Sequence, residues 1–334
     1  MRRTTNACLI RANSFGLKST AEELIEVSSV EELMGSLAES PSATILGEGS
    51  NVVLHRHIRG RVIRVRIRGI SLTRANENVY RVRGGAGERW NDLVRCVLGR
   101  GIRGLENLSL IPGSVGAAPY QNIGAYGREL GPMVESVEVV DRFTMALRTL
   151  SAGECEFRYR DSVFKTDAPG RYVITHVNIV TGGQAIDSSY PDIDAELGRL
   201  GYDRPNPTHV ANAVIRVRRR KLPDPRLIGN VGSFFRNPLL SMKDFAQLRG
   251  KIDVQGFEEG GLVKVSAARL IDEAGWKGFQ DGAVAVWYRQ PLVLINTGGA
   301  TASDVLGLAE RILDDVQRRY GVRLEREPIE LGRP

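Results

Sequence analysis

The stretch "ENLSLIPGSVGAAPYQNIGAYGREL", residues 106–130, gives the strongest indication of the fold. Small residues recur along it and leave little side-chain volume, namely Gly113, Gly116, Ala117, Ala118, Gly124, Ala125 and Gly127. Long segments without regular structure are usually functional or disordered. Disorder is opposed here by interspersed larger side chains, namely Ile111, Val115, Ile123 and Tyr126. Two interpretations stay open: backbone packed closely around a large flat ligand, or a structural glycine-rich crossover.

A second glycine-rich turn, "LGEGSNVVL" at residues 46–54, lies between two short predicted strands. Glycines leave backbone N–H groups uncovered, so such a turn can bind an oxyanion. No Gly-Lys-Ser/Thr follows, which excludes a Walker A loop. The chain continues into a strand rather than a helix, which excludes a dinucleotide-binding Rossmann turn. A phosphate-binding turn and a plain tight hairpin both fit this sequence.

The length and composition indicate a globular protein of more than one domain. Its 334 residues are 42% hydrophobic and 25% charged, and the chain is too long for one ordinary core. No apolar run approaches the ~20 residues of a membrane span, and the N-terminus has no apolar stretch of signal-peptide length. We therefore expect a cytoplasmic protein without membrane partners. Cys8, Cys96 and Cys155 show no disulfide or metal-binding spacing, so we expect buried free thiols and no metal site.

Basic residues exceed acidic ones by 46 − 39 = 7 and concentrate in two segments. Residues 63–68, "IRVRIR", alternate apolar and arginine side chains, which predicts a half-buried strand with a solvated face. Residues 216–221, "RVRRRK", end a predicted helix over 208–221 and could lie near phosphates. Pro223 and Pro225 stop that helix, and we expect a domain boundary there. Aromatic residues make up 6% of the chain and provide no stacking set, so we expect no nucleic-acid partner.

The segment "FRYRDSVFK", residues 157–165, presents Tyr159 and Arg160 in sequence on a predicted strand. Neighbouring residues of a regular strand point to opposite faces, so only one of the two need meet a ligand. Arg160 is the better carboxylate ligand because its guanidinium donates in a planar fork. A surface Tyr-Arg pair without a ligand is the alternative.

The segment "GNVGSFFRNP", residues 229–238, sets Ser233 beside two phenylalanines. A hydrolytic serine usually lies in a Gly-x-Ser-x-Gly turn with a general base. Here the serine is followed by Phe-Phe, and none of the four histidines stands in a triad-like context. A serine hydroxyl in a dry pocket can also give a proton to a carbanion. Proton donor and structural serine both remain open from these residues alone.

Taken together, these stretches resemble the UDP-N-acetylenolpyruvoylglucosamine reductases, flavin enzymes of peptidoglycan precursor synthesis. The resemblance covers nearly the whole chain and rests on the order and spacing of its blocks. Besides those quoted above, they are "NSFGLKSTA" (13–21), "KLPDP" (221–225), "LVLINTGGATASDV" (292–305) and "GVRLEREPIEL" (321–331). Tyr190 in "SSYPDID" resembles the loop tyrosine of the subtype that carries an extra substrate loop.

The resemblance implies an α+β fold, with a two-lobed FAD-binding module of the vanillyl-alcohol-oxidase type and a separate α+β substrate-binding domain. We expect lobe 1 at residues 1–70, lobe 2 at 71–222 with the tail 320–334 returning near it, and the substrate domain at 223–319. FAD, bound non-covalently, would lie on the two glycine-rich segments. The implied cofactor-binding residues are Gly47, Glu48, Gly49, Ser50, Asn51, Ile111, Pro112, Gly113, Ser114, Gly116, Asn122, Gly124, Ala125, Tyr126 and Gly127.

The implied reaction is reduction of UDP-GlcNAc-enolpyruvate to UDP-N-acetylmuramate, with NADPH as co-substrate. Ser233 matches the family's proton donor. Arg160 and Glu327 match the residues that polarise the substrate carboxylate, where negative charge develops. Glu327 could assist there only by donating a hydrogen bond in its protonated form. The implied substrate-binding residues are Tyr159, Tyr190, Lys221, Asn237 and Gln290.

One departure and two alternatives accompany this hypothesis. Arg269 stands in "AARLID" where the family usually has tryptophan, which leaves the packing near the uridine open. A different FAD oxidase or dehydrogenase on the same fold would not need the serine loop together with the "LEREP" tail. A nucleotide-binding module without enzymatic activity would leave Ser233, Arg160 and Glu327 without a joint purpose. We expect a monomer active in cell-wall formation, and hence in cell shape and division.

Overall fold

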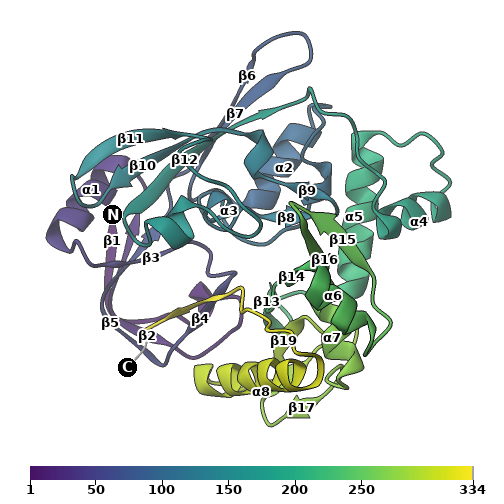
Figure 1. The fold of residues 1–334 in the computed structure, drawn as a ribbon. Helices are drawn as coiled ribbons and strands as arrows, with labels where there is room; N and C mark the ends of the chain where they lie inside the picture. The colour runs from purple at the N-terminus through teal and green to yellow at the C-terminus, as the bar shows by residue number, and fades with distance from the viewer. Residues whose placement is uncertain (333–334) are drawn as a thin grey trace. The chain divides into compact units, whose positions relative to one another are not determined.

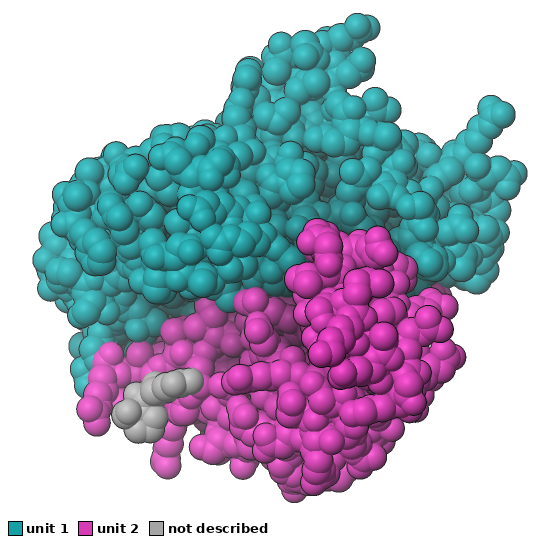
Figure 2. All heavy atoms as spheres, in the orientation of Figure 1, with its two compact units in different colours: residues 1–7, 21–49, 60–219 teal, residues 8–20, 50–59, 220–334 magenta. Residues whose placement is uncertain are grey.

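The computed structural model describes residues 1–332, and its backbone contacts divide the chain into two compact units (Figure 2). Unit 1 comprises residues 1–7, 21–49 and 60–219; unit 2 comprises residues 8–20, 50–59 and the chain from 220 onward. Segments 8–20 and 50–59 and the tail thus group with residues 220–319. The expected boundaries at 70 and 222, with a third domain, stay a prediction.

The first sheet of unit 1 forms around a parallel strand pair. Its order is β1 (Arg2–Cys8), β2 (Thr20–Val27), β5 (His57–Val65) and β3 (Thr44–Leu46), with β3 parallel to β5. Helix α1 (Val30–Glu39) connects β2 to β3. The Ser29 hydroxyl accepts a hydrogen bond from the Glu32 amide at 3.2 Å, so the N-cap relieves an amide that has no partner within the helix.

The second sheet of unit 1 is antiparallel throughout. Its order is β11 (Ala146–Ser151), β10 (Val134–Asp141), β12 (Tyr172–Thr181), β7 (Tyr80–Gly85) and β6 (Ile70–Arg74). Helix α2 (Trp90–Leu98) lies beside this sheet in Figure 1. It buries Trp90, Leu93, Val94 and Val97, which share one face because they recur at helical spacing.

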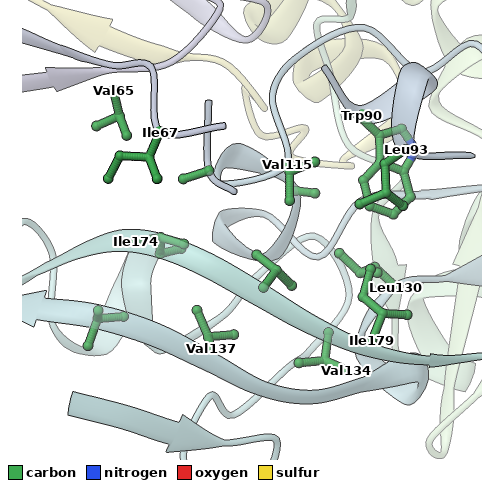
Figure 3. Packing of buried hydrophobic residues seen from close by; sticks show 14 of the residues in the cluster. Val65, Ile67, Trp90, Leu93, Val115, Leu130, Val134, Val137, Ile174 and Ile179 are labelled. Atoms are coloured by element: carbon green, nitrogen blue, oxygen red, sulfur yellow. The ribbon is translucent and has the colours of Figure 1, made fainter. Parts of the chain in front are cut away.

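The core of unit 1 joins this helix, the sheet and the long glycine-rich segment (Figure 3). Trp90 and Leu93 of α2 point toward Val115 of the segment, and Val137 and Ile179 belong to the same buried cluster. The Trp90 indole donates to the Leu108 carbonyl at 2.9 Å. The segment is therefore an ordered part of the core. Short elements punctuate it: a 3-10 turn (Glu106–Leu108), α3 (Ala117–Tyr120), β8 (Gly124–Ala125) and β9 (Arg128–Glu129).

Two further helices, α4 (Pro191–Arg199) and α5 (Pro207–Lys221), pack on each other through a small apolar cluster. Its buried members are Ile193, Leu197, Val210, Ala213, Val214 and Val217. Helix α5 confirms the predicted helix over 208–221. A further 3-10 turn (Gly131–Met133) and a π-turn (Val163–Asp167) complete unit 1.

Unit 2 holds two antiparallel sheets, three helices and a short parallel strand pair. The first sheet has the order β13 (Gly229–Ser233), β19 (Val293–Asn296), β18 (Val284–Val286) and β17 (Gln280–Asp281). The second has the order β14 (Leu239–Leu240), β16 (Leu262–Val265) and β15 (Gly256–Glu259). The helices are α6 (Met242–Arg249), α7 (Ala267–Glu273) and α8 (Ala302–Tyr320). β20 (Ile329–Leu331) pairs with β4 (Val52–Leu54), and a 3-10 turn spans Ile10–Ala12. Phe15, Phe234 and Phe235 lie in its core.

Among residues 1–332, no helix combines the length and the apolar character that crossing a membrane requires. The three cysteines are free, but only Cys155 is buried, and burial raises its pKa to about 12. The expectation of buried thiols is wrong for Cys8, which is exposed on β1.

Substitution of Gly87 tests how closely its backbone approaches the backbone of residues 66–67 in unit 1. A Cβ there would overlap the Arg66 backbone and lie 2.7 Å from the Ile67 amide nitrogen, so Gly87→Ala should destabilise the protein by about 1–3 kcal/mol. Gly35 on α1 is a matched control, because a Cβ there meets nothing within 4 Å, and Gly35→Ala should stabilise by about 0.5–1 kcal/mol. Calorimetric Tm values measure both; a Tm unchanged by Gly87→Ala would contradict the packing.

Candidate active site

The two predicted cofactor-binding segments of unit 1 touch each other. A Cβ on Gly47 would lie 2.6 Å from Ser114 Oγ, so only glycine fits at this contact without displacing the serine. Gly49 has a φ of +66°, the left-handed region that glycine adopts without strain. The turn after β3 therefore packs directly against the Ser114 side chain of the long segment.

Residues 113–116 are fixed by backbone hydrogen bonds to the entrance of α2. The Gly113 carbonyl accepts from the Trp90 amide at 2.9 Å, and the Gly116 amide donates to the Ala86 carbonyl at 3.0 Å. A Cβ on Gly116 would lie 2.6 Å from the Ala86 Cβ. These bonds hold the segment in place, and Gly113 and Gly116 leave its backbone uncovered, as the predicted cofactor cradle requires.

Two arginines of the alternating stretch at residues 63–68 bind the first glycine-rich turn. Arg66 Nη1 donates to Glu48 Oε1 at 2.8 Å, and Arg64 Nε donates to the Gly47 carbonyl at 3.3 Å. Burial, then the neighbouring Arg66, lowers the pKa of Arg64, which Glu48 and Glu26 oppose. The expected solvated face is thus engaged in ion pairs that hold the turn at residues 47–48.

Asn122 lies at the centre of the second half of the long segment and is buried. Its Nδ2 donates to Glu129 Oε2 and to the Arg158 carbonyl, each at 2.9 Å, and its Oδ1 accepts from the Gly131 amide at 2.7 Å. The amide is thereby committed to protein partners. A contact of Asn122 with a cofactor would have to come from its backbone.

Tyr159 and Arg160 lie in a turn, not on a strand as predicted from the sequence. Arg158 and Asp161 exchange backbone hydrogen bonds at 3.0 and 3.1 Å across the two residues, and Arg160 has a φ of +54°. The Arg160 guanidinium donates to the Gly124 carbonyl at 2.7 Å and lies 5.3 Å from the centroid of the Tyr159 ring. Both side chains therefore lie together at the tip of one turn, beside the cofactor segment.

Tyr126 and Tyr190, assigned to different ligands on the sequence, pack edge to face with ring centroids 5.3 Å apart. Tyr126 also shares a hydrogen bond with Arg218 of α5. Burial lowers the pKa of Arg218, the Tyr126 hydroxyl opposes this shift, and the positive charge of Arg160 lowers the pKa further. Unit 1 thus places two guanidinium groups near each other. Sequence reasoning missed Arg218 because the basic cluster 216–221 does not indicate which of its side chains contacts Tyr126.

Ser233 ends β13 at an irregularity in its pairing with β19. Gly232 before it has a φ of +74°, and Phe234 and Phe235 after it are buried. Asn230 fixes the strand by donating to the Pro223 and Ile228 carbonyls at 3.2 and 2.8 Å and accepting from the Gly232 amide at 3.0 Å. Among the residues that the structure describes, Ser233 Oγ has no hydrogen-bond partner.

Glu327 lies alongside this loop in unit 2. Its amide donates to the Phe234 carbonyl at 2.9 Å, and Arg326 forms an isolated bridge with Phe235. The Asn51 side-chain amide donates to the Glu327 carbonyl at 3.5 Å. Ser233 immediately precedes the residue that binds the Glu327 backbone, so the two predicted catalytic residues of unit 2 come together.

The predicted substrate-binding residues of unit 2 lie around the same strands. The Lys221 carbonyl accepts from the Trp287 indole at 3.0 Å, and Gln290 follows in the turn between β18 and β19. Asn237 Oδ1 accepts from the Ala267 amide at the start of α7, at 3.0 Å. Arg269, on the exposed side of α7, pairs with Glu273 at 2.5 Å, so its departure from the family pattern disturbs no buried contact.

Comparison with known proteins identifies the class. A family model of the FAD binding domain matches residues 24–146, and this match together with the small-residue cradle defines an FAD-binding protein. A model of the C-terminal domain of UDP-N-acetylenolpyruvoylglucosamine reductase matches residues 224–331.

The chain belongs to the UDP-N-acetylenolpyruvoylglucosamine reductase family. Reductases so named from Azoarcus sp. and Bdellovibrio bacteriovorus are each 43% identical to it, over 98% and 96% of this chain and 97% of each relative. The crystal structure of the Thermus caldophilus reductase superposes with a TM-score of 0.67 and 26% identity, over 99% of this chain and 98% of that one. The predicted family, fold class, FAD cofactor and oxidoreductase assignment are confirmed. The roles of individual residues and the loop-tyrosine subtype remain predictions.

Gly116→Ala tests whether the cradle holds the cofactor. The added methyl group would push residues 113–117 away from Ala86, and FAD affinity should fall about tenfold. Gly198→Ala is the matched control, because a Cβ at this α4 position meets nothing within 4 Å. Flavin absorbance per mole of purified protein, followed by titration with FAD, gives the affinity. Equal affinities in the two variants would exclude this segment from the cofactor site.

Proposed function

We propose that the chain reduces UDP-GlcNAc-enolpyruvate to UDP-N-acetylmuramate, using FAD and NADPH. Family membership supports the FAD-dependent reduction in peptidoglycan precursor synthesis. The observation that carries the mechanism is the Ser233 hydroxyl, held on a rigid strand end next to Glu327 and without a base. We propose further that the enzyme works as a cytoplasmic monomer.

FAD would be held by the cradle of residues 47–51 and 111–127. Backbone amides at glycine turns suit its diphosphate, and the absence of side chains admits a flat ring system. When bound, FAD supplies the hydride that it has received from NADPH. The ion pairs of Arg66 and Arg64 with Glu48 keep the first turn of this cradle in place.

Arg160 would bind the substrate carboxylate. Its guanidinium is oriented by the Gly124 carbonyl at 2.7 Å and the Asn122 carbonyl at 3.5 Å. Arg218 adds a second positive charge near it. As the double bond is reduced, negative charge accumulates next to the carboxylate, and donors that are already oriented stabilise this charge without reorganisation.

Ser233 would complete the reaction by giving its Oγ proton to the substrate carbon next to the carboxylate. The hydride adds to the terminal carbon of the enolpyruvyl group, so one hydride and one proton saturate the double bond. The serine is left as an alkoxide and regains a proton from water. Buried Phe234 and Phe235 fix the backbone on its C-terminal side. Glu327, whose amide binds the Phe234 carbonyl, would lie beside the developing charge.

The remaining residues would bind the nucleotide-sugar. Lys221 supplies a positive charge for the diphosphate at the end of α5, and Asn237 keeps its Nδ2 as a donor while its Oδ1 binds α7. Gln290 adds a further polar contact from the turn after β18. Tyr159 and the 41%-exposed Tyr190 offer aromatic rings to the substrate from unit 1.

An anaerobic half-reaction assay tests the activity. NADPH should bleach the flavin, and addition of UDP-GlcNAc-enolpyruvate should restore its absorbance. Bleaching without substrate-dependent reoxidation would assign the protein a different acceptor.

Ser233→Ala tests the proton donor. Flavin reduction by NADPH should be unchanged, whereas reoxidation by the substrate should slow by about 10²–10⁴-fold, because only that step needs the proton. Ser303→Ala on the exposed face of α8 is the matched control and should leave both steps unchanged. Stopped-flow absorbance at the flavin band measures each step. Equal slowing of the two half-reactions by Ser233→Ala would disprove the assigned role.

Arg160→Lys tests the carboxylate site while retaining the charge. Lysine lacks the planar fork that reaches the carbonyls of residues 122 and 124, so its ammonium would not be oriented. We expect reoxidation to slow by about 10²-fold and flavin reduction to stay within twofold of the unsubstituted enzyme. The same stopped-flow experiment is the measurement. Full activity of Arg160→Lys would show that a charge without orientation is enough.

A further inference from the structure

The basic cluster at residues 216–221 divides between different faces of α5. Arg218 is directed to Tyr126. Arg216 and Arg219 instead share a stripe with Asn212 and Ile215, because positions 212, 215, 216 and 219 recur at the three- and four-residue spacing of one helix face. The proposed reaction uses Arg218 and Lys221 and gives no role to this second face.

This face of α5 borders a hollow of about 500 Å³ within unit 1. The lining residues are Asn212, Ile215, Arg216 and Arg219 of α5 with Leu200 and Tyr202, which follow α4. The volume lies within the range of sites that bind small molecules, about 300–1,000 Å³. None of the six residues belongs to the proposed cofactor or substrate sites.

The charge in this hollow is uncompensated. Within residues 1–332, neither Arg216 nor Arg219 forms an ion pair or donates a side-chain hydrogen bond, and no carboxylate lines the hollow. The nearby Glu196 of α4 is bound to Arg199 at 2.5 Å and is not available to them. Two guanidinium groups one helical turn apart repel each other, and a bound anion would relieve that repulsion.

The remaining lining of the hollow is mostly apolar. The Tyr202 ring stacks on the His209 ring with centroids 3.8 Å apart and an interplanar angle of 8°. Tyr202 also packs against the apolar cluster of α4 and α5, and Leu200 and Ile215 add aliphatic surface. Apolar side chains and two cations that line one hollow match a ligand with an anionic group on a less polar body.

We propose that the hollow between α4 and α5 binds a small phosphorylated molecule. Arg216 and Arg219 bind its phosphate, and Tyr202 contacts the rest of the ligand. Guanidinium groups form paired, charge-assisted hydrogen bonds with phosphate oxygens, and two of them one turn apart can share one phosphate or span a diphosphate. Asn212 supplies an amide donor on the same stripe. This site goes beyond the proposed reaction and does not depend on it.

Calorimetric titration of the FAD-loaded protein tests the site. Saturating UDP-N-acetylmuramate is present, so that the proposed substrate site is filled. The probes are inorganic pyrophosphate and adenosine 5′-monophosphate, which separate a free phosphate ligand from a phosphate ester. Arg216→Gln/Arg219→Gln should weaken binding of either probe at least tenfold. Arg95→Gln/Arg204→Gln is the matched control, since both arginines are exposed in unit 1 outside the hollow and the net charge changes equally.

The outcomes separate the site from general electrostatic attraction. Loss of binding in the first double variant with less than a twofold change in the control supports the proposal. Tighter binding of adenosine monophosphate than of pyrophosphate would assign the ligand as a phosphate ester, and the reverse order as free phosphate. Equal weakening in both variants, or no binding of either probe at millimolar concentration, overturns the proposal. An unchanged rate of UDP-GlcNAc-enolpyruvate reduction in both variants shows that the proposed reaction is unaffected.

Discussion

The close packing around three glycines of unit 1 is the constraint on which this unit depends. Gly47 meets Ser114, Gly116 meets Ala86, and Gly87 meets Arg66, each at a separation that leaves no room for a Cβ. These contacts bring β3, β7 and the long segment to one place. At these three positions only glycine fits, so the neighbouring segments pack more closely than a longer side chain would allow. A cofactor bound there would meet the uncovered backbone of these glycines.

Arginines on the second sheet of unit 1 are paired with carboxylates, whereas Arg218, a neighbour of Arg160, is arranged differently. On the second sheet of unit 1, Arg81 pairs with Glu135 at 2.8 Å and Arg83 with Glu138 at 2.7 Å. Such exposed pairs contribute about 0–1 kcal/mol each and mainly prevent repulsion. Arg218 differs, because a tyrosine hydroxyl is its partner and Arg160 is a cationic neighbour. Placing a second cation beside the desolvated Arg218 guanidinium costs stability, and the carboxylate binding that we propose for Arg160 would give that arrangement a purpose.

The parts of the fold that sequence reasoning predicted are those set by local chemistry. Pro223 and Pro225 follow the end of α5, so a few neighbouring residues were enough to predict where this helix stops. The turn at Tyr159 and Arg160 was missed because it is fixed from a distance. Its left-handed Arg160 is held by carbonyls 36 and 38 residues away in the chain. Likewise, spacing along α5 did not reveal which arginine would meet Tyr126, since that depends on where another loop lies.

In the reaction that we propose, Ser233 is a weak acid whose usefulness depends on its being held in place. A serine hydroxyl is far less acidic than a carboxylic acid, so it gives a proton only to a strongly basic carbon. Positioning compensates for the low acidity. Asn230 binds three backbone groups in the stretch 223–232 before Ser233, and Phe234 and Phe235 are buried just after it, so the backbone would need no ordering before the proton transfer that we propose. A neutral donor also adds no charge beside a carboxylate that is becoming more negative, which a carboxylate at the same position would do.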